Sequence, residues 1–290
     1  MTLLNAILLG LLQGLAEFLP ISSSGHLAIF EVLFKVENAG MVFDILLHLG
    51  TLLAIFVAYW KDIKMLVVEG FLIVFGSIGN AGRFIINITR KDNKLTYNQI
   101  INTPYRKFVV LVIVSTIPTG IIGIVLKDII DAASSSLLVT GTCLLITGLM
   151  LIVSDMVQPG KKKPNQVKYR EAGIIGIVQG LATFPGISRS GSTITACLLC
   201  GFDKSFAVKY SFIMSIPAVM GAAILELKDF GEVAVTSTEL VYYGIGTLVA
   251  ALVGYICIKT MLVVVRGKKF KYFAYYCFAI GLFSIIWHLV

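Results

Sequence analysis

The sequence predicts an all-α integral membrane protein, with six transmembrane helices and two re-entrant helical hairpins in an inverted-topology repeat. Three observations support this fold class. Hydrophobic residues make up 57% of the 290-residue chain, charged residues make up 14%, and the mean hydropathy is +0.91. Apolar runs of membrane-spanning length recur along the chain, and one segment of the sequence occurs twice. A chain of this kind is embedded in a bilayer rather than held there by one anchor.

Six apolar runs approach the roughly 20 residues that a bilayer core requires. They are residues 41–60, 107–127, 136–157, 207–227, 240–262 and 272–290. Two further apolar stretches, 3–35 and 171–202, are interrupted midway by Pro20 and by Pro185–Gly186. Because each half is too short to cross, we expect each stretch to enter and leave the membrane on one side, as a re-entrant hairpin.

The chain is expected to form a single membrane domain made of two halves. The first inverted repeat covers residues 1–158 and the second covers 159–290, and each contains one hairpin followed by three spans. The first half also contains an insertion, 61–106. Part of it, 64–89, mixes apolar residues with charged residues, Gly and Asn. We expect that part to be an amphipathic interfacial segment rather than a seventh span.

The basic residues predict the orientation of the chain. Of the 24 Lys and Arg residues, 19 fall in the segments 61–107, 161–170, 204–209 and 266–271. A single threading places all four segments in the cytoplasm, as the positive-inside rule requires, and leaves both termini outside. The first hairpin then opens to the extracytoplasmic side and the second to the cytoplasm. The net charge of +8 follows from this loop bias, so we expect no nucleic-acid partner.

Residues 10–25 and 176–191 are two copies of one segment, identical at ten of sixteen positions. Each copy runs from an apolar stretch, through a Pro or Gly break, into a Ser- and Gly-rich cluster. Paired broken helices in a membrane protein point to the functional site, because irregular backbone is tolerated at membrane depth only where protein or a cavity surrounds it. The copies differ in charge, since the first carries Glu17 and the second carries Arg189.

The first copy offers an acid, hydroxyls and an imidazole. An ionised carboxylate at membrane depth costs roughly 2.5–3.5 kcal/mol, so Glu17 should face a polar cavity or a cation unless it snorkels to water. Gln13 lies one turn earlier on the same helix face. His26 follows a Ser/Gly cluster at 22–25, and the pKa range of a histidine suits proton transfer near neutral pH. A lone His is more often a satisfied hydrogen-bonding group, and we interpret His48 in this way, although it could line the same cavity.

The second copy reads P-G-I-S-R-S-G-S-T from Pro185 to Thr193. A Gly- and Ser-rich turn that opens a helix presents backbone N–H groups and the positive end of the helix dipole to an anion. Arg189 adds a planar fork of donors that matches phosphate oxygens, and the alternative is that it pairs with a carboxylate such as Glu17. The residues expected to bind substrate across the two copies are Ser22, Ser24, Gly25, Gly186, Ser188, Ser190, Gly191 and Thr193.

Superposing the repeats by their two-fold relation brings both hairpin tips into one cavity. An acid, a hydroxyl–imidazole pair and an anion site would then meet inside a lipid-facing shell. This combination suits attack on a phosphoanhydride carried by a membrane lipid. The sequence contains no Walker loop or nucleotide fingerprint, so ATP is not the expected phosphate donor.

The same residues resemble a known family. The segment Gln13–Leu27, Q-G-L-A-E-F-L-P-I-S-S-S-G-H-L, resembles the (E/Q)-x-x-x-E and S-S-x-G-H motifs of bacterial undecaprenyl-diphosphatases of the bacitracin-resistance type. Pro185–Thr193 resembles their P-G-x-S-R-S-x-x-T motif, and Phe43–Thr51 and Ser215–Ala218 are also similar. The resemblance covers essentially the whole chain. It implies hydrolysis of undecaprenyl diphosphate to undecaprenyl phosphate and inorganic phosphate, which recycles the peptidoglycan lipid carrier and confers bacitracin resistance.

The resemblance also implies a multi-pass protein of the bacterial plasma membrane, with an active site that opens to the extracytoplasmic face. The implied cofactor is a divalent cation, Mg²⁺ or Ca²⁺, held by Glu17 and Gln13. Gln13 offers a neutral oxygen to a metal but no charge. The implied partners are a polyprenyl diphosphate lipid substrate and membrane lipids, and a homodimer is left open as the oligomeric state.

Four residues carry the expected catalytic roles. Arg189 is the implied diphosphate clamp, Glu17 serves metal binding and catalysis, Ser23 is a proposed nucleophile and His26 a proposed base or nucleophile. In the mechanism that we expect, His26 deprotonates Ser23, which attacks the terminal phosphorus; in the alternatives, His26 attacks or activates water. The other functional class is a transporter or flippase of undecaprenyl phosphate, because alternating-access carriers also use inverted repeats of broken helices. The asymmetry between the two copies favours the enzyme.

Overall fold

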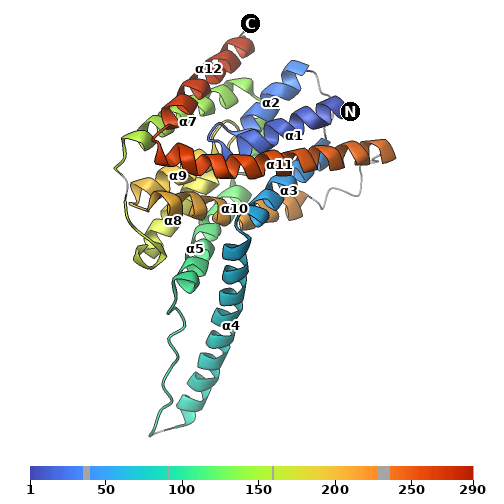
Figure 1. Ribbon diagram of the computed structural model, residues 1–290. Coiled ribbons are helices and arrows are strands. Elements are labelled where there is room, and N and C mark those ends of the chain that lie inside the picture. Colours follow the sequence, from blue (N-terminus) through green and yellow to red (C-terminus); the bar gives the residue numbers. More distant parts are fainter. Residues whose placement is uncertain (35–39, 91, 159, 227–235, 290) are drawn as a thin grey trace.

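The computed structural model describes residues 1–34, 40–90, 92–158, 160–226 and 236–289 of the chain. These residues form twelve α-helices and one short 3-10 helix, Pro164–Gln166, and the prediction of an all-α membrane protein is confirmed. Both termini lie toward the same end of the molecule (Figure 1).

Each repeated segment folds into two helices with a break between them. The first pair is α1 (Leu3–Phe18) and α2 (Ser23–Phe34), and the second is α8 (Tyr169–Leu181) and α9 (Arg189–Leu199). The breaks coincide with the predicted interruptions at Pro20 and Pro185–Gly186, where proline removes a backbone donor and disrupts the helix. The sequence therefore located both hairpins, whereas their re-entry into a membrane stays a prediction.

The predicted spans correspond to long helices. They are α3 (Gly40–Ala58), α5 (Pro104–Val125), α7 (Leu137–Met156), α10 (Lys204–Glu226), α11 (Ser237–Arg266) and α12 (Phe270–Leu289). All except the shorter α3 are long and apolar enough to cross a membrane. A short amphipathic helix, α6 (Lys127–Ser134), joins α5 to α7.

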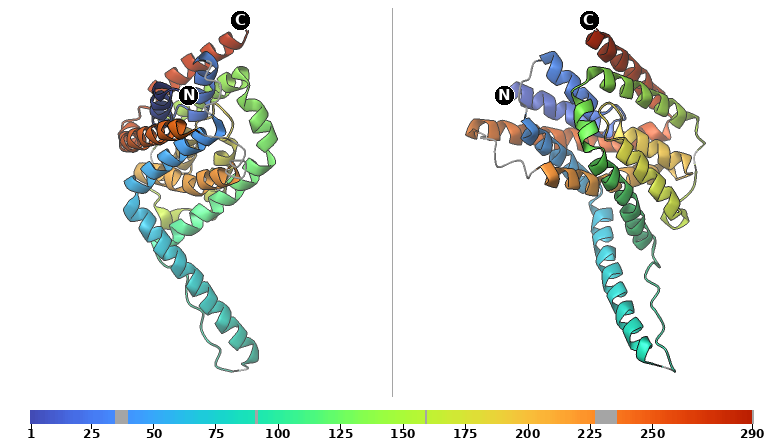
Figure 2. Two further views of the ribbon diagram at one scale, coloured as in Figure 1. Left: turned by 90° about the vertical axis from the view of Figure 1, so that its right-hand side faces the viewer. Right: turned by 180° about the vertical axis from the view of Figure 1, so that it is seen from behind.

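The insertion contains one long helix, and its predicted interfacial position stays a prediction. Residues 60–89 form a single helix, α4 (Trp60–Thr89), which by length and composition also qualifies as a membrane span. The helix continues through several Gly and Asn residues, and the side chains of Asn80 and Asn87 bond the backbone of the segment that returns beside it. Figures 1 and 2 show α4 projecting from the rest of the molecule, with the chain returning beside it to α5.

The hairpins pack against helices of the opposite half. Helix α1 lies against α11, and α8 lies against α5, so the two halves repeat the same kind of contact. Glycine allows the close approach in both places: a Cβ on Gly10 would collide with the backbone of Gly246, and one on Gly176 would collide with the backbone of Ser115. This exchange packs the first helix of each hairpin against a long helix of the opposite half.

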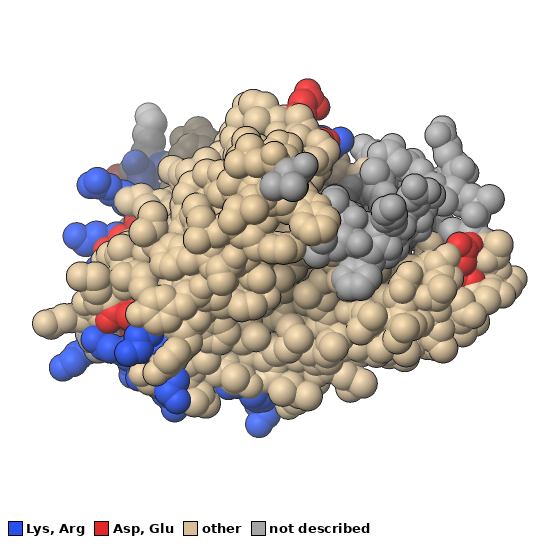
Figure 3. Space-filling view, turned by 90° about the horizontal axis from the view of Figure 1, so that it is seen from above, with Lys and Arg blue, Asp and Glu red and all other residues tan. Residues whose placement is uncertain are grey.

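The basic segments meet at one end of the molecule. Lys162 Nζ donates to Glu171 at 2.6 Å, and Lys204 Nζ donates to the carbonyl of Arg266 at 3.1 Å. The backbone N–H of Lys271 donates to Asp155 at 2.8 Å. Figure 3 shows Lys and Arg gathered toward one end, while the middle of that face carries almost no charge. This clustering is what the predicted threading requires.

Candidate active site

The two hairpin tips touch each other backbone to backbone. A Cβ on Gly25 would lie 2.9 Å from Cα of Gly186, and one on Gly191 would lie 3.0 Å from Cβ of Pro20. Gly186 also has a φ of +92°, in the left-handed region that glycine adopts without steric cost. The Ser/Gly clusters of the repeat are therefore needed for the crossing of the tips, as well as for chemistry.

Equivalent serines start the second helix of each hairpin. Ser22 Oγ accepts a hydrogen bond from the N–H of Gly25 at 3.3 Å, and Ser188 Oγ accepts one from the N–H of Gly191 at 3.1 Å. Each is a side-chain cap on an otherwise unsatisfied helix N-terminus. The next residue after each cap, Ser23 in α2 and Arg189 in α9, occupies the equivalent position in the two copies.

Both of these residues bind the same carboxylate. Glu17 Oε1 forms an ion pair with Nη2 of Arg189, and Glu17 Oε2 accepts a hydrogen bond from Ser23 Oγ at 2.6 Å. Gln13 Nε2, one helical turn earlier, donates to the same Oε2 at 3.1 Å. Glu17 is only 7% exposed, and a buried carboxylate needs such partners to remain charged. The alternative that paired Arg189 with Glu17 is thus realised in this structure.

Two buried polar atoms of this cluster are left for a ligand. Arg189 Nη1 and Gln13 Oε1 are buried and have no hydrogen-bond partner among the described residues. An unsatisfied guanidinium N–H in a dry site is costly, and a phosphate oxygen would satisfy it. The ion pair of the cluster is therefore formed, but Arg189 Nη1 and Gln13 Oε1 still lack hydrogen-bond partners among the described residues.

A cavity of about 470 Å³ opens beside the cluster. Its polar lining consists of Glu17, Ser22, Ser23, Ser24, Asp44, His48, Thr119, Ser134, Gln179, Thr183 and Arg189. Its apolar lining includes Leu27, Ala28, Ile45, Ala218, Val219, Ala222 and Ala223. Five of the predicted site residues line it: Glu17, Ser22, Ser23, Ser24 and Arg189. Half of the other lining residues come from α3, α5 and α10, in each case from the half of the helix that is farther along the chain from the nearest basic segment.

The structure does not place His26 against Ser23. His26 Nδ1 is 2.8 Å from the backbone oxygen of Ser22, and Nε2 is 2.8 Å from the hydroxyl of Tyr276 in α12. Both ring nitrogens thus have partners other than Ser23, whose hydroxyl donates to Glu17 instead. The expected Ser23–His26 pair is not formed here, because the helix that starts at Ser23 directs His26 toward α12. In this arrangement His26 holds Ser22, whose φ of +71° is unusual for a residue with a side chain.

The remaining residues of the second copy support the tip rather than line the cavity. Thr193 Oγ1 donates to the backbone oxygen of Arg189 at 2.8 Å and lies 2.5 Å from Ser211 Oγ. Ser190 Oγ donates to the backbone oxygen of Leu19 at 3.4 Å. Ser188, Gly186 and Gly191 are likewise used in caps and close contacts. Their predicted contact with phosphate therefore requires a rearrangement of the tip.

Several site residues were missed from the sequence. Thr147 of α7 holds the second tip: its hydroxyl donates to the oxygen of Gly186 at 2.9 Å and accepts from the N–H of Ser188 at 3.0 Å. Nothing in the sequence around Thr147 indicates this role. The repeat does contain a signal for Gln179, which is the counterpart of Gln13. Its amide oxygen is likewise buried and has no hydrogen-bond partner in the part of the chain that the structure describes. His48 lines the cavity, and its Nδ1 lies 2.8 Å from the backbone oxygen of Asp44.

The oxygen donors of the site suit a cation that a substrate also binds. They do not form a complete metal site by themselves. Among the described residues no group of three or more His, Cys, Asp or Glu side chains could hold a metal ion. Glu17 and the unpartnered oxygen of Gln13 are two oxygen donors of the kind that Mg²⁺ and Ca²⁺ prefer. Mg²⁺ is commonly bound by one or two carboxylates together with substrate phosphates. The donor set thus fits a divalent cation that arrives with a diphosphate.

The fold and the site together define a multi-pass integral membrane protein whose helices enclose a charged cluster between two broken-helix tips. Residues 6–283 match the family model of the bacitracin resistance protein BacA. Similar proteins named undecaprenyl-diphosphatase occur in Methanosphaera stadtmanae, with 41% identity over 288 residues and 99% of each chain covered, and in Alkaliphilus metalliredigens, with 40% identity over 291 residues and all of each chain covered. A third, from Halothermothrix orenii, is 38% identical over 286 residues, which cover 99% of this chain and 98% of that protein. The chain belongs to the BacA family.

Proposed function

We propose that this protein is an undecaprenyl-diphosphate phosphatase, which hydrolyses undecaprenyl diphosphate to undecaprenyl phosphate and inorganic phosphate and so confers bacitracin resistance. The observation that carries the proposal is the cluster of Glu17, Ser23 and Arg189, which joins a base, a hydroxyl and a phosphate-binding cation across the two tips. The names of the relatives supply the substrate. We place the reaction at the extracytoplasmic face of the cell membrane, because the α3, α5 and α10 residues that line the cavity lie in the halves of those helices remote from the basic segments.

Substrate binding exchanges one anion for another on Arg189. The free Nη1 of Arg189 meets a phosphate oxygen first, and the bidentate fork then turns from Glu17 to the diphosphate. Glu17 Oε1 thereby loses Arg189 and becomes available to the divalent cation, while Oε2 keeps its hydrogen bond from Ser23 and can accept the proton of that hydroxyl. The apolar cavity wall, which includes Leu27, Ile45 and Val219, accommodates the start of the polyprenyl chain.

Two chemical steps follow. Ser23 Oγ attacks the terminal phosphorus while its proton passes to Glu17, the bond to the bridging oxygen breaks, and undecaprenyl phosphate leaves. Water then attacks the phosphoserine and the bond from phosphorus to Oγ breaks. Glu17 returns the proton to Ser23 Oγ, and inorganic phosphate leaves as dihydrogen phosphate with the oxygen and both protons of the attacking water. The 2.6 Å hydrogen bond from Ser23 to Glu17 supports this pairing over the expected pair of Ser23 with His26.

The cofactor is a divalent cation, Mg²⁺ or Ca²⁺, held by Glu17 and the amide oxygen of Gln13. When bound, it neutralises negative charge on the diphosphate. His26 acts as a positioning residue, because its bonds to Ser22 and Tyr276 fix the backbone from which Ser23 projects. The lipid partner is the polyprenyl diphosphate itself, and a homodimer stays open.

The test separates an enzyme from a carrier. Purified protein in detergent is supplied with undecaprenyl diphosphate and Mg²⁺ or Ca²⁺, and released phosphate is measured with and without EDTA. We expect steady, cation-dependent release by the wild type. Lys259→Ala, which removes an exposed cation on α11 outside the site, should release phosphate at the same rate. Folded protein that releases no phosphate, but moves undecaprenyl phosphate across vesicle membranes, would contradict the enzyme and favour the flippase.

A further inference from the structure

Helix α4 and the return segment 92–103 form an arm that the proposed reaction does not use. One face of α4 is polar and is covered by the return segment. Asn80 exchanges two hydrogen bonds with the backbone of Asn98, each at 2.8 Å, and Asn87 exchanges two with the backbone of Leu95, at 2.9 and 2.7 Å. Arg83 donates to the oxygen of Thr96 at 3.1 Å. The polar groups of the helix are thus satisfied by the return segment.

The opposite face of the same helix is apolar and open. At helical spacing it presents large side chains that are each more than half exposed: Phe71 (61%), Phe75 (66%), Ile78 (62%) and Ile85 (64%). The most apolar 18-residue window of α4 has a mean hydropathy of 1.6, and none of its residues is buried. A continuous apolar face of this size marks an interaction surface, because water is an unfavourable environment for it.

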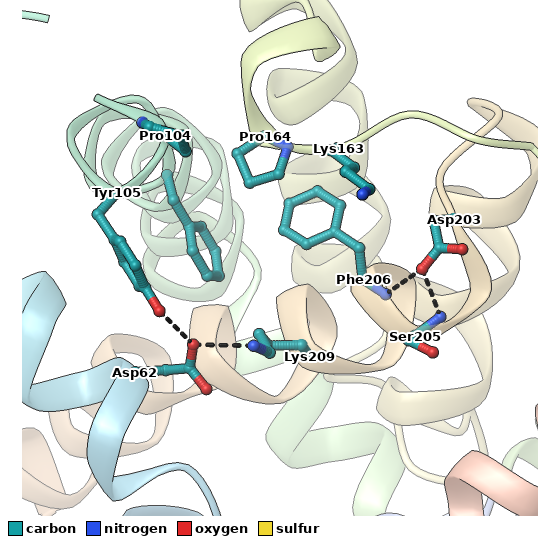
Figure 4. Close-up of a pocket in the computed structure, with 10 residues that line it drawn as sticks. Asp62, Pro104, Tyr105, Lys163, Pro164, Asp203, Ser205, Phe206 and Lys209 are labelled. Carbon is teal, nitrogen blue, oxygen red and sulfur yellow. Dashed lines mark hydrogen bonds and ion pairs between the residues drawn. The ribbon is translucent and has the colours of Figure 1, made fainter. Parts of the chain in front are cut away.

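The root of the arm is fixed to the helical body. Asp62 accepts hydrogen bonds from Lys209 Nζ of α10 at 2.8 Å and from the hydroxyl of Tyr105 of α5 at 2.9 Å (Figure 4). Arg106 forms an ion pair with Glu69 at 2.7 Å. From this root α4 runs across the direction of α10 and α11 (Figure 1). With α10 and α11 as membrane spans, α4 runs along the plane of the bilayer rather than through it.

The return segment is incompatible with burial of the whole arm in the lipid hydrocarbon. It contains no helix or strand, so most of its backbone polar groups must be satisfied by water. An irregular segment of this kind is not tolerated where it faces lipid hydrocarbon. An apolar helix face with a hydrated segment on its back is the geometry of an interfacial helix, which buries one face in the headgroup region and leaves the other wet.

We propose that the arm binds the surface of an anionic membrane, with Phe71, Phe75 and Ile78 in lipid and the return segment toward water. Charge favours this partner, because basic residues lie at both ends of the arm: Lys61 and Lys64 at the root, Arg90 and Lys94 at the tip. A second copy of the chain fits less well. A two-fold antiparallel pairing of the apolar faces would place the basic root of one arm against the basic tip of the other.

The test places a nitroxide label on the full-length protein in lipid nanodiscs. The label is attached at Phe75→Cys on the apolar face and, as the matched control, at Thr96→Cys on the return segment. Protein without an added cysteine gives the background from the five native ones. We expect the label at position 75 to collide mainly with oxygen, which dissolves in lipid, and the label at 96 mainly with a water-soluble nickel chelate.

Three results would contradict the proposal. In the first, the nickel chelate reaches position 75 as readily as position 96, so that the apolar face lies in water. In the second, the label at position 75 is shielded from both reagents, and its spectrum is broadened by a neighbouring label. Dilution of labelled with unlabelled protein would remove this broadening, which would mean that a second copy covers the face. If the arm prefers anionic lipid, the label at position 75 lies deeper in nanodiscs that contain phosphatidylglycerol than in nanodiscs of phosphatidylcholine alone. Equal depth in the two lipids would be the third contradicting result.

Discussion

Arg189, which is partly buried, and Glu17, which is buried, form an ion pair that joins the two copies of the repeat across 172 residues of sequence. The pair holds the tips together in the resting protein, and in the proposed reaction it is also the place where the diphosphate enters. One contact therefore serves both stability and catalysis, and changes to either partner should affect both properties.

Breaking one side of this pair should destabilise the protein. Glu17→Gln leaves the Arg189 cation without its partner, and Arg189→Gln leaves the Glu17 carboxylate without its partner; losing one partner of a buried pair costs about 3–5 kcal/mol. The double variant contains no uncompensated charge, so we expect it to be more stable than either single variant. Thermal unfolding in detergent measures this order. A double variant whose losses are simply additive would show that the pair is not coupled.

Ser23 is expected to carry the phosphoryl group between the two steps. Ser23→Ala should lower kcat by at least about 100-fold, in the range of nucleophilic and general-base contributions. Acid quenching of the wild type during turnover, followed by mass spectrometry, should detect phosphate on the peptide that contains Ser23. Near-normal turnover by Ser23→Ala would exclude the phosphoserine and leave Glu17 as the base for direct attack by water.

His26 and Tyr276 should behave as a positioning pair. Because His26 Nε2 bonds the Tyr276 hydroxyl, Tyr276→Phe and His26→Asn should each lower kcat to a similar, moderate extent, about tenfold. Neither should change the shape of the pH profile near neutrality. Loss of the limb near neutral pH in His26→Asn, with Tyr276→Phe unaffected, would instead identify His26 as the base of the alternative mechanism.

Gly186 should tolerate no side chain. Its left-handed backbone costs about 1–2 kcal/mol for any other residue, and a Cβ there would also collide with the backbone oxygen of Thr140. We expect Gly186→Ala to lower both the unfolding temperature and the rate of phosphate release. Gly173 of α8 is the matched control, since a Cβ there meets nothing within 4 Å. Equal behaviour of the two variants would show that the crossing of the tips does not need Gly186.

The proposed cation should bind with the diphosphate and not before it. Glu17 is already engaged by three side chains, and the described residues supply no three-ligand cluster. Calorimetric titration of Mg²⁺ or Ca²⁺ should therefore give no heat of tight binding to the protein alone, and clear binding once a diphosphate analogue is present. Tight binding in the absence of the analogue would indicate a preformed metal site.

The sequence predicted the broken helices and the meeting of the tips, because proline breaks and a sixteen-residue repeat are local signals. It paired Ser23 with His26, whereas in the structure Ser23 bonds Glu17; spacing cannot show that a helix beginning at Ser23 directs His26 toward Tyr276, 250 residues further along the chain. The roles of Ser188 and Ser190 were similarly ambiguous. A hydroxyl at a helix N-terminus can bind an anion or cap the backbone, and only tertiary packing decides between them.

Chemical rescue of Arg189 tests the central claim most directly, namely that one site is built from both tips. Phosphate release from undecaprenyl diphosphate is measured for Arg189→Ala, with Lys259→Ala as control, at increasing concentrations of guanidinium ion below those that unfold the protein. We predict that Arg189→Ala is nearly inactive, that guanidinium restores part of its rate, and that the control is unaffected. A fully active Arg189→Ala variant would contradict the account, because the second tip would then contribute nothing to the reaction.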